Sequence, residues 1–349
     1  MKNPDSYICI TRLGQECFIK EEARSCPVPP QCTELAPGVV ELSGISEQQI
    51  RANGIFFACQ LLPQPVPCSS QSIKGWAALL LEALVNSIPE ETEAWGLQVF
   101  DQSTAETGKQ HSRARLIEQE TVALLKQKRR SLLRKLSKDP SKHAALAQLV
   151  LTSPDDGYLS ITSAPQVKAL SPVISPFRAG YVSIPDDRLP PSRAFKKLRE
   201  AQLRFGLSFR PGMQCADLGA CPGGWTHVLV EAGCRVLAVD RSPLDPKLMR
   251  SKQVSFASGD AFSWTPEKAL DWLVCDVIAA PEKTAALIER WLRERLCHSL
   301  CVTVKFKGSP DFGVLASVKR SLAQHCVEHG GKQLTANKNE LTVFGHLAD

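Results

Sequence analysis

The fold of the C-terminal half is decided by nine residues, Asp217-Leu218-Gly219-Ala220-Cys221-Pro222-Gly223-Gly224-Trp225. The apolar residues 214–218 predict a buried strand that runs into this stretch, and residues 225–232 predict a helix that leaves it. Glycines in such a turn let the backbone pass close to a bound ligand, because they have no Cβ. The stretch therefore predicts a ligand site between a strand and a helix.

The segments that follow continue the alternation of strands and helices. Residues 235–240 and 254–260 are expected strands, and each ends in an acidic residue, Asp240 or Asp260. This alternation is typical of a parallel, doubly wound sheet that binds its ligand at the carboxyl ends of the strands. We therefore predict an α/β, Rossmann-like fold for this part of the chain.

The spacing of the glycines argues against a nicotinamide dinucleotide as the ligand. Such a turn needs G-x-G-x-x-G, but counting from Gly219 the second required glycine is Cys221, and a proline follows it. A methyl donor such as S-adenosylmethionine has no phosphate, and it needs acids near its ribose hydroxyls and its adenine amine. Asp217, Asp240 and Asp260 supply these acids, with capping of the following helices as their alternative role. We predict an S-adenosyl-L-methionine site.

The N-terminal half predicts two small α+β units. The elements expected in the first are two strands, a helix and a further apolar run, at residues 7–10, 39–42, 15–23 and 55–59. The proline-rich residues 63–67 close this unit. The second unit combines helices with strands, at residues 73–87, 95–100 and 113–136, and two strands that meet at the turn 154–157.

The expected long helix at residues 113–136 carries eight basic side chains beside an apolar seam, and Lys138 follows it. A solvated face and a contact to RNA phosphates are equally good explanations of this charge. A second proline-rich passage, residues 171–176, ends this unit.

The composition fits a protein with more than one core. The chain has 349 residues, 43% of them hydrophobic, and its net charge of +6 suits a polyanionic partner without requiring one. The thirteen cysteines form no CxxC pair, and the polar residues 1–5 do not resemble a signal peptide, so we expect reduced thiols and a cytoplasmic location. The apolar run at residues 76–85 is short of the roughly 20 residues that span a bilayer. We expect no membrane partner, and a monomer by default.

Residues 217–225 look like the cofactor loop of the FtsJ-like RNA ribose methyltransferases, and the whole chain resembles the RlmM branch of that family, which modifies large-subunit ribosomal RNA. The resemblance implies a ferredoxin-like domain at residues 1–66, a THUMP-like RNA-binding domain at 67–172 and a Rossmann-like methyltransferase domain at 173–349. The implied cofactor is S-adenosyl-L-methionine, and the implied partner is large-subunit ribosomal RNA or its precursor particle, with a cytidine as the candidate target. The expected cofactor contacts are Asp217, Gly219, Cys221, Pro222, Gly223, Gly224, Trp225, Asp240, Asp260 and Asp276.

The family's catalytic signature is a Lys-Asp-Lys-Glu tetrad. Residues 192–198, Ser-Arg-Ala-Phe-Lys-Lys-Leu, are similar to the family segment S-R-x-x-x-K-L, which selects Lys197 as the first lysine. Residues 272–276, Trp-Leu-Val-Cys-Asp, are similar to the family's fourth strand and give Asp276.

The other half of the tetrad lies further along the chain. The strand at residues 301–305 supplies Lys305, with Lys307 as the alternative, because residues 306–308 depart from the family pattern. Residues 339–343, Asn-Glu-Leu-Thr-Val, resemble the late segment that carries the glutamate, which gives Glu340.

These residue types suit methylation of a ribose 2′-hydroxyl, which is a weak acid and needs a base at hydrogen-bond distance. A lysine serves as a base only when it is neutral, and burial beside a second cation favours the neutral form. We therefore assign Lys305 as the general base and Lys197 as its neighbour, with Asp276 and Glu340 orienting both lysines. A single lysine or acid at a strand end more often forms a surface salt bridge than a catalytic site, so the assignment depends on all four residues together.

Two other functions compete with ribose methylation. A non-catalytic RNA-binding or ribosome assembly factor would keep the fold without turnover. An RNA base methyltransferase would carry an Asn-Pro-Pro-Tyr-like tetrapeptide after the fourth strand, where this chain has residues 275–278, Cys-Asp-Val-Ile. No paired set of closely spaced histidines and cysteines predicts a metal site, and we interpret Cys221 as a small loop residue, not a nucleophile.

Overall fold

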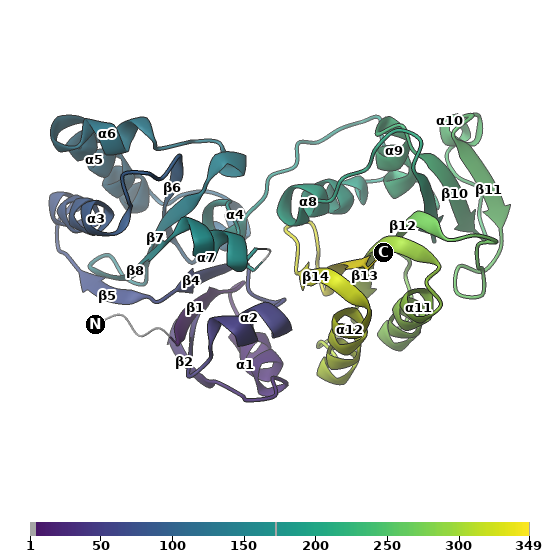
Figure 1. Cartoon of the computed structure of the whole chain (residues 1–349), viewed down its shortest axis with the longest axis horizontal. Helices are drawn as coiled ribbons and strands as arrows, with labels where there is room; N and C mark the ends of the chain where they lie inside the picture. The colour runs from purple at the N-terminus through teal and green to yellow at the C-terminus, as the bar shows by residue number, and fades with distance from the viewer. Residues whose placement is uncertain (1–4, 172, 349) are drawn as a thin grey trace. The chain divides into compact units, whose positions relative to one another are not determined.

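The computed structural model describes residues 5–171 and 173–348 (Figure 1). The chain forms two compact units, Met1–Val182 and Ser183–Asp349. Pro172, at the expected end of the second domain, lies outside the described residues, as do the first four residues and the last. In the described part of the chain, no helix has the length and apolar character needed to cross a membrane.

The first unit begins with a four-stranded sheet in the order β2-β3-β1-β4. Its strands are β1 (Ser6–Ile10), β2 (Gln31–Ala36), β3 (Val39–Ser43) and β4 (Gln60–Pro63), and its helices are α1 (Glu16–Arg24) and α2 (Glu47–Asn53). The apolar residues 55–59 form a buried loop before β4 and not a strand. The backbone N–H groups of Phe56 and Phe57 donate to the carboxylate of Glu22, at 2.7 and 3.1 Å, instead of to a neighbouring strand.

A second four-stranded sheet in the same unit has the order β5-β8-β7-β6. Its strands are β5 (Val66–Ser69), β6 (Trp95–Asp101), β7 (Ala145–Leu151) and β8 (Asp156–Thr162), with α3 (Ile73–Ser87), α4 (Thr104–Thr107), α5 (Ser112–Lys128), α6 (Arg130–Arg134) and α7 (Ala164–Ala169). Short 3₁₀ turns occupy η1 (Pro140–Lys142) and η2 (Arg178–Gly180). The helices α3 and α5 bury an apolar stripe against one face of this sheet.

The single long helix expected at residues 113–136 is wrong, because the structure divides it into α5 and α6. Arg129 separates them with non-helical φ and ψ angles of −145° and 63°. The cause lies far away in the chain: Trp95 donates its indole N–H to the carbonyl of Leu132 and its backbone N–H to the carbonyl of Lys135, both at 3.0 Å. These bonds draw the end of the segment toward β6.

The proline-rich segment 63–67 contains the change from one sheet to the other. Strand β4 ends at Pro63 in the first sheet, and β5 begins at Val66 in the second. Buried polar groups join the two sheets: Gln60 donates to the side chain of Gln98 at 3.2 Å, and Ser160 donates to the carbonyl of Pro63. Because such buried groups need partners, these bonds hold the two sheets together within one unit.

The second unit contains one seven-stranded sheet in the order β11-β10-β9-β12-β13-β15-β14. Its strands are β9 (Gln214–Leu218), β10 (Arg235–Asp240), β11 (Val254–Ser258), β12 (Leu270–Cys275), β13 (Cys297–Lys305), β14 (Cys326–Lys332) and β15 (Glu340–Leu347). Its helices are α8 (Phe195–Phe205), α9 (Gly224–Glu231), α10 (Pro246–Met249), α11 (Pro281–Arg293) and α12 (Phe312–His325).

This sheet is mixed, not wholly parallel as the sequence suggested. Strands β9 to β13 pair in parallel, but β15 lies antiparallel between β13 and β14. Helices α8 and α9 cover one face, and α11 and α12 lie on the other (Figure 1). Because successive strand residues face opposite sides, Trp272 and Val274 of β12 join the core under α8 and α9. The fold thus agrees with the predicted Rossmann-like character and corrects the strand directions.

Candidate active site

The turn between β9 and α9 has a backbone that requires glycine at two positions. Gly219 has a φ of +73° and Gly223 a φ of +113°. A Cβ at Gly219 would lie 2.6 Å from Cβ of Val277, and one at Gly223 would meet the side chain of Leu248. The turn therefore packs so closely against Val277 and Leu248 that neither position has room for a Cβ.

Asp217, near the end of β9, connects the strand before the turn to the helix after it. Its side chain is buried and accepts a hydrogen bond from the hydroxyl of Thr226, on α9, at 2.6 Å. Burial raises the pKa of Asp217 from 3.8 to about 7, and the Thr226 hydrogen bond opposes this shift. Asp217 thus joins β9 to α9 and does not line the pocket that the turn borders.

The raised pKa of Asp217 predicts a pH-dependent stability. The folded state holds the proton more tightly than the unfolded state, so ionisation of Asp217 destabilises the fold increasingly as the pH rises from about 4 to about 7. We expect Asp217→Asn to gain melting temperature over the wild type between pH 5 and pH 8, by at least about 4 °C. Calorimetry across this range tests the prediction, and a difference that does not change with pH would contradict it.

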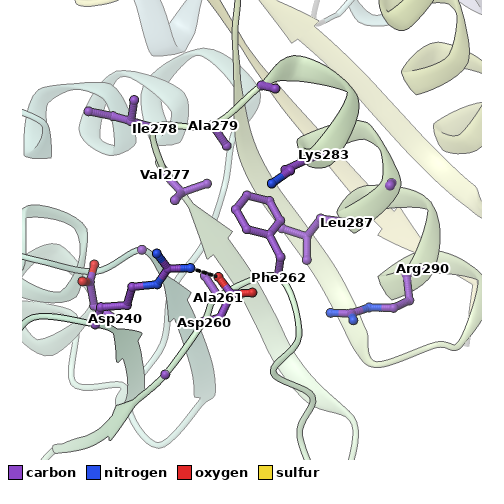
Figure 2. Close-up of a pocket in the computed structure, with 15 residues that line it drawn as sticks. Asp240, Asp260, Ala261, Phe262, Val277, Ile278, Ala279, Lys283, Leu287 and Arg290 are labelled. Atoms are coloured by element: carbon purple, nitrogen blue, oxygen red, sulfur yellow. Dashed lines mark hydrogen bonds and ion pairs between the residues drawn. The ribbon is translucent and has the colours of Figure 1, made fainter.

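A pocket of about 660 Å³ lies beside the turn (Figure 2). Three of the predicted cofactor residues line it: Gly219, Asp240 and Asp260. The carboxylate of Asp240 accepts the backbone N–H groups of Cys221 at 3.0 Å and Ser242 at 2.9 Å. These bonds fix both the carboxylate and the turn, so that Asp240 presents a rigid acceptor at the end of β10.

The other predicted cofactor residues do not line this pocket: Asp217, Cys221, Pro222, Gly223, Gly224, Trp225 and Asp276. Trp225 lies in the core between α8 and α9, where its indole N–H donates to the carbonyl of Ala194 at 2.9 Å. The size of the indole explains this placement, because it fills the space between the two helices. Cys221 is exposed, and its thiol lies 3.4 Å from the carbonyl of Pro243.

The pocket also contains residues that the sequence did not indicate. Phe262 and Val277 follow strand-end acids, so their positions offered a signal, whereas Lys283, Leu287 and Arg290 come from α11 (Figure 2). The packing of α11 brings its residues to the pocket, and nothing in their local pattern shows it. The pocket therefore combines an apolar wall with two acids and three cations. Lys283 and Arg290 come from α11, and Arg241 pairs with Asp260 at 3.1 Å.

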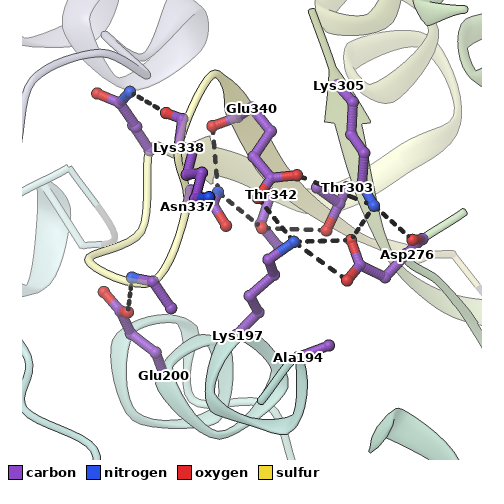
Figure 3. A network of polar contacts seen from close by, with 12 residues as sticks. Ala194, Lys197, Glu200, Asp276, Thr303, Lys305, Asn337, Lys338, Glu340 and Thr342 are labelled. Atoms are coloured by element: carbon purple, nitrogen blue, oxygen red, sulfur yellow. Dashed lines mark hydrogen bonds and ion pairs between the residues drawn. The ribbon is translucent and has the colours of Figure 1, made fainter. Parts of the chain in front are cut away.

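Four charged side chains form a second cluster, which we call the tetrad: Lys197, Asp276, Lys305 and Glu340 (Figure 3). Nζ of Lys197 lies 3.0 and 3.1 Å from the two carboxylate oxygens of Asp276 and 2.7 Å from Oε1 of Glu340. Nζ of Lys305 lies 3.1 Å from Oδ1 of Asp276 and 2.7 Å from its backbone carbonyl. The structure thus brings together all four residues chosen from the sequence.

Each member of the tetrad comes from a different element. Lys197 is on α8, Asp276 directly follows β12, Lys305 ends β13 and Glu340 begins β15. Lys305 and Glu340 are paired in the register of the two strands. Lys307, the alternative to Lys305, is exposed two residues beyond the strand.

The two lysines of the tetrad have different surroundings. Lys197 contacts both carboxylates at 3.0 Å or less, whereas Lys305 lies 4.0 Å from the nearest oxygen of Glu340. The side chain of Lys305 is 20% exposed, against 11% for Lys197. Lys197 is therefore held by two carboxylates, and Lys305 is the lysine that an incoming group reaches more easily.

Over residues 5–171 and 173–348, no three or more histidine, cysteine or acidic side chains are grouped so as to hold a metal ion. None of the thirteen cysteines, all of which lie in the described ranges, forms a disulfide bond.

Part of the second unit is similar in sequence to a known protein family. Residues 190–315 match the model of the FtsJ-like methyltransferase family, a range that contains the glycine turn and three of the tetrad residues. The match lies within the second unit, Ser183–Asp349, which is therefore similar in sequence to FtsJ-like methyltransferases.

The chain is similar to curated proteins named "Ribosomal RNA large subunit methyltransferase M". It is 38% identical to the one from Edwardsiella ictaluri (strain 93-146) over 184 residues, which cover 48% of each chain. It is 44% identical to the one from Azotobacter vinelandii over 124 residues, covering 34% of this chain and 35% of that protein. The match to the one from Pseudomonas aeruginosa (strain LESB58) is 33% identical and covers 60% of each. The chain spans about half the length of the first of these relatives.

Proposed function

We propose that the protein transfers a methyl group from S-adenosyl-L-methionine to a ribose 2′-hydroxyl of large-subunit ribosomal RNA. The observation that carries this proposal is the tetrad, in which a lysine at a strand end stands beside a second, doubly paired lysine. Val277, which lines the pocket, directly follows Asp276 of the tetrad, so the two sites adjoin in the chain. Such a pair of adjoining sites is what transfer between two bound reactants needs.

The pocket residues fit the proposed cofactor. Asp240 and Asp260 offer carboxylates for ribose hydroxyls and for an adenine amine, and Phe262, Val277 and Leu287 offer apolar surface for a purine ring. The volume of about 660 Å³ falls in the range common for small-molecule sites. When bound, S-adenosylmethionine supplies an electrophilic methyl group on a sulfonium.

The tetrad supplies the other half of the reaction. The neutral amine of Lys305 accepts the proton of the 2′-hydroxyl as the oxygen attacks the methyl group. Lys197, held as an ammonium by Asp276 and Glu340, donates a hydrogen bond that stabilises the charge developing on that oxygen. Asp276 orients both lysines at once, since its carboxylate contacts each Nζ. The products are a 2′-O-methyl ribose and S-adenosylhomocysteine.

The N-terminal unit is proposed to bind the RNA, with residues 1–66 as a ferredoxin-like domain and 67–172 as a THUMP-like domain. Two observations support this proposal. The chain passes from one four-stranded sheet to the other at residues 63–66, and basic residues occupy the end of α5 and α6. Exposed cations there include Lys126, Lys128, Arg129 and Arg130. Lysine and arginine clusters bind phosphates without regard to sequence. We further propose that the protein acts as a monomer in the cytoplasm, on the RNA or its precursor particle, with a cytidine as the candidate target.

Transfer of labelled methyl groups to large-subunit RNA that lacks the modification tests the proposed function. We expect the wild-type protein to place label in alkali-resistant dinucleotides, because a 2′-O-methyl group blocks cleavage of the adjacent linkage. Label in alkali-labile nucleotides would indicate base methylation instead. Cofactor binding without label on RNA or particles would indicate a non-catalytic RNA-binding factor.

A further inference from the structure

A buried carboxylate lies on α8 three residues after Lys197. Glu200 has no exposed surface, although isolated charges are costly to bury. Helix residues three apart share a face, so Lys197 and Glu200 point from α8 in the same general direction. Figure 3 shows Glu200 directed toward the segment that leads into β15 and Lys197 directed toward Asp276 and Glu340.

Glu200 holds the backbone of this segment. The N–H of Thr335 donates to Oε1 of Glu200 at 2.7 Å, and the N–H of Ala336 donates to Oε2 at 3.2 Å. Hydrogen bonds to a carboxylate are stronger than those between neutral groups. Residues 333–339, which we call the pre-β15 segment, are thereby attached to the helix that carries Lys197, and they lead directly to Glu340.

Further hydrogen bonds fix the pre-β15 segment and join it to the start of β15. The side chain of Asn337 donates to the carbonyl of Glu340 at 3.2 Å and to the hydroxyl of Thr342 at 3.1 Å. The side chain of Gln333 donates to the carbonyl of Lys338 at 2.8 Å. A displacement at Thr335 is therefore passed on to the start of β15, where Glu340 lies.

Arg204 also interacts with Glu200. A guanidinium nitrogen of Arg204 lies 3.9 Å from Oε1 of Glu200, a longer distance than the two backbone contacts. Burial raises the pKa of Glu200, and Arg204 and the two backbone N–H groups oppose this by favouring the carboxylate. The carboxylate thus pairs with Arg204 and also holds the pre-β15 segment by the two shorter contacts.

We infer that Glu200 is a positioning residue for methyl transfer: by fixing Thr335 and Ala336, it keeps Glu340 within reach of Lys197. The inference rests on the proposed function. Lys197 and Glu340 are 2.7 Å apart, so a shift of the segment would separate them and leave Lys197 free to turn from the substrate. Misplacements of about 1 Å lower enzymatic rates by up to about 100-fold.

The test compares Glu200→Gln and Glu200→Asp with the wild type in the labelled-methyl assay. In Glu200→Gln, one of the two backbone N–H groups faces an amide NH₂ in place of an acceptor. Glu200→Asp keeps the charge near Arg204 but withdraws the carboxylate by about 1.5 Å. We expect both variants to lose about 10- to 100-fold in kcat, with the KM for S-adenosylmethionine changed less than about threefold, since Glu200 does not line the cofactor pocket.

Hydrogen exchange gives a second measurement that does not depend on activity. The backbone amides of residues 335 and 336 are expected to exchange faster in both variants than in the wild type. Glu22→Gln is the matched control, because the buried Glu22 accepts two backbone N–H groups in the same way but in the first unit. It is expected to lower the melting temperature and to leave kcat unchanged.

The outcomes separate the two proposals. If the wild type transfers no methyl group, the proposed function fails, and unchanged exchange in the variants would then separately overturn the role of Glu200 in holding the segment. If the wild type is active and the variants keep its kcat, the inference is wrong. An equal loss of kcat in Glu22→Gln would also overturn it, since that loss would report stability alone. Should Glu200→Gln not fold, Glu200→Asp decides.

Discussion

Replacing Lys305 by alanine is expected to lower the rate of methyl transfer at least about 1,000-fold, within the range that removal of a general base produces. The side chain of Lys305 is the more exposed of the two tetrad lysines and stands beside Asp276. It does not line the cofactor pocket, and the Kd for S-adenosylmethionine should change less than about threefold. Single-turnover transfer and calorimetric titration of the cofactor measure the two quantities separately.

Lys307→Ala is the control for this experiment. Lys307 has the same charge two residues away and is exposed beyond the end of β13. We expect it to retain the wild-type single-turnover rate. A large loss in Lys307→Ala together with near-normal transfer in Lys305→Ala would move the base from Lys305 to Lys307 and refute the assignment made here.

Replacing Gly219 by alanine is expected to weaken binding of S-adenosylmethionine by about 100-fold or more, which corresponds to about 2.7 kcal/mol. The new Cβ would lie 2.6 Å from Cβ of Val277, and both residues line the pocket. Relief of this contact requires movement of the turn or of the segment after β12. Either movement changes the shape of the pocket, and titration calorimetry measures the resulting Kd.

Gly212→Ala separates the contact from the backbone conformation. Gly212 also has a positive φ, +87°, but a Cβ there meets nothing within 4 Å. Both substitutions therefore carry the strain of a left-handed residue, about 1 kcal/mol, and only Gly219→Ala also obstructs the pocket. Equal cofactor affinity in the two variants would show that the turn does not border the cofactor.

The sequence predicted several strands of the second unit, because strongly apolar segments carry a clear period, but it did not predict helices α8, α11 and α12 or strand β14. The strands at residues 214–218 and 235–240 are confirmed with the same bounds. The antiparallel direction of β15 could not be predicted from the sequence, since the pairing of strands in a sheet depends on contacts between residues far apart in the chain. Strand β2 was missed for a different reason: as an edge strand it is mostly exposed and has no regular alternation of buried and exposed residues.

The candidate site was predictable to the extent that its residues occupy strand ends and turns. Gly219, Asp240 and Asp260 were identified there and do line the pocket. Trp225 shows the limit, because an aromatic side chain after a glycine turn serves a ligand or a core equally well, and only the position of α8 decides. The cations of α11 show another limit, since Lys283 and Arg290 reach the pocket through helix packing.

The pairing of Lys305 with Glu340 has a consequence for how the chain tolerates changes in length. The two residues are opposite one another in the β13–β15 ladder, although α12 and β14 lie between them in the sequence. Their spacing is thus set by strand register and not by the length of the connection. Extra or missing residues in the loops around α12 leave the pair together, whereas a one-residue slip within β15 turns Glu340 to the opposite face of the sheet.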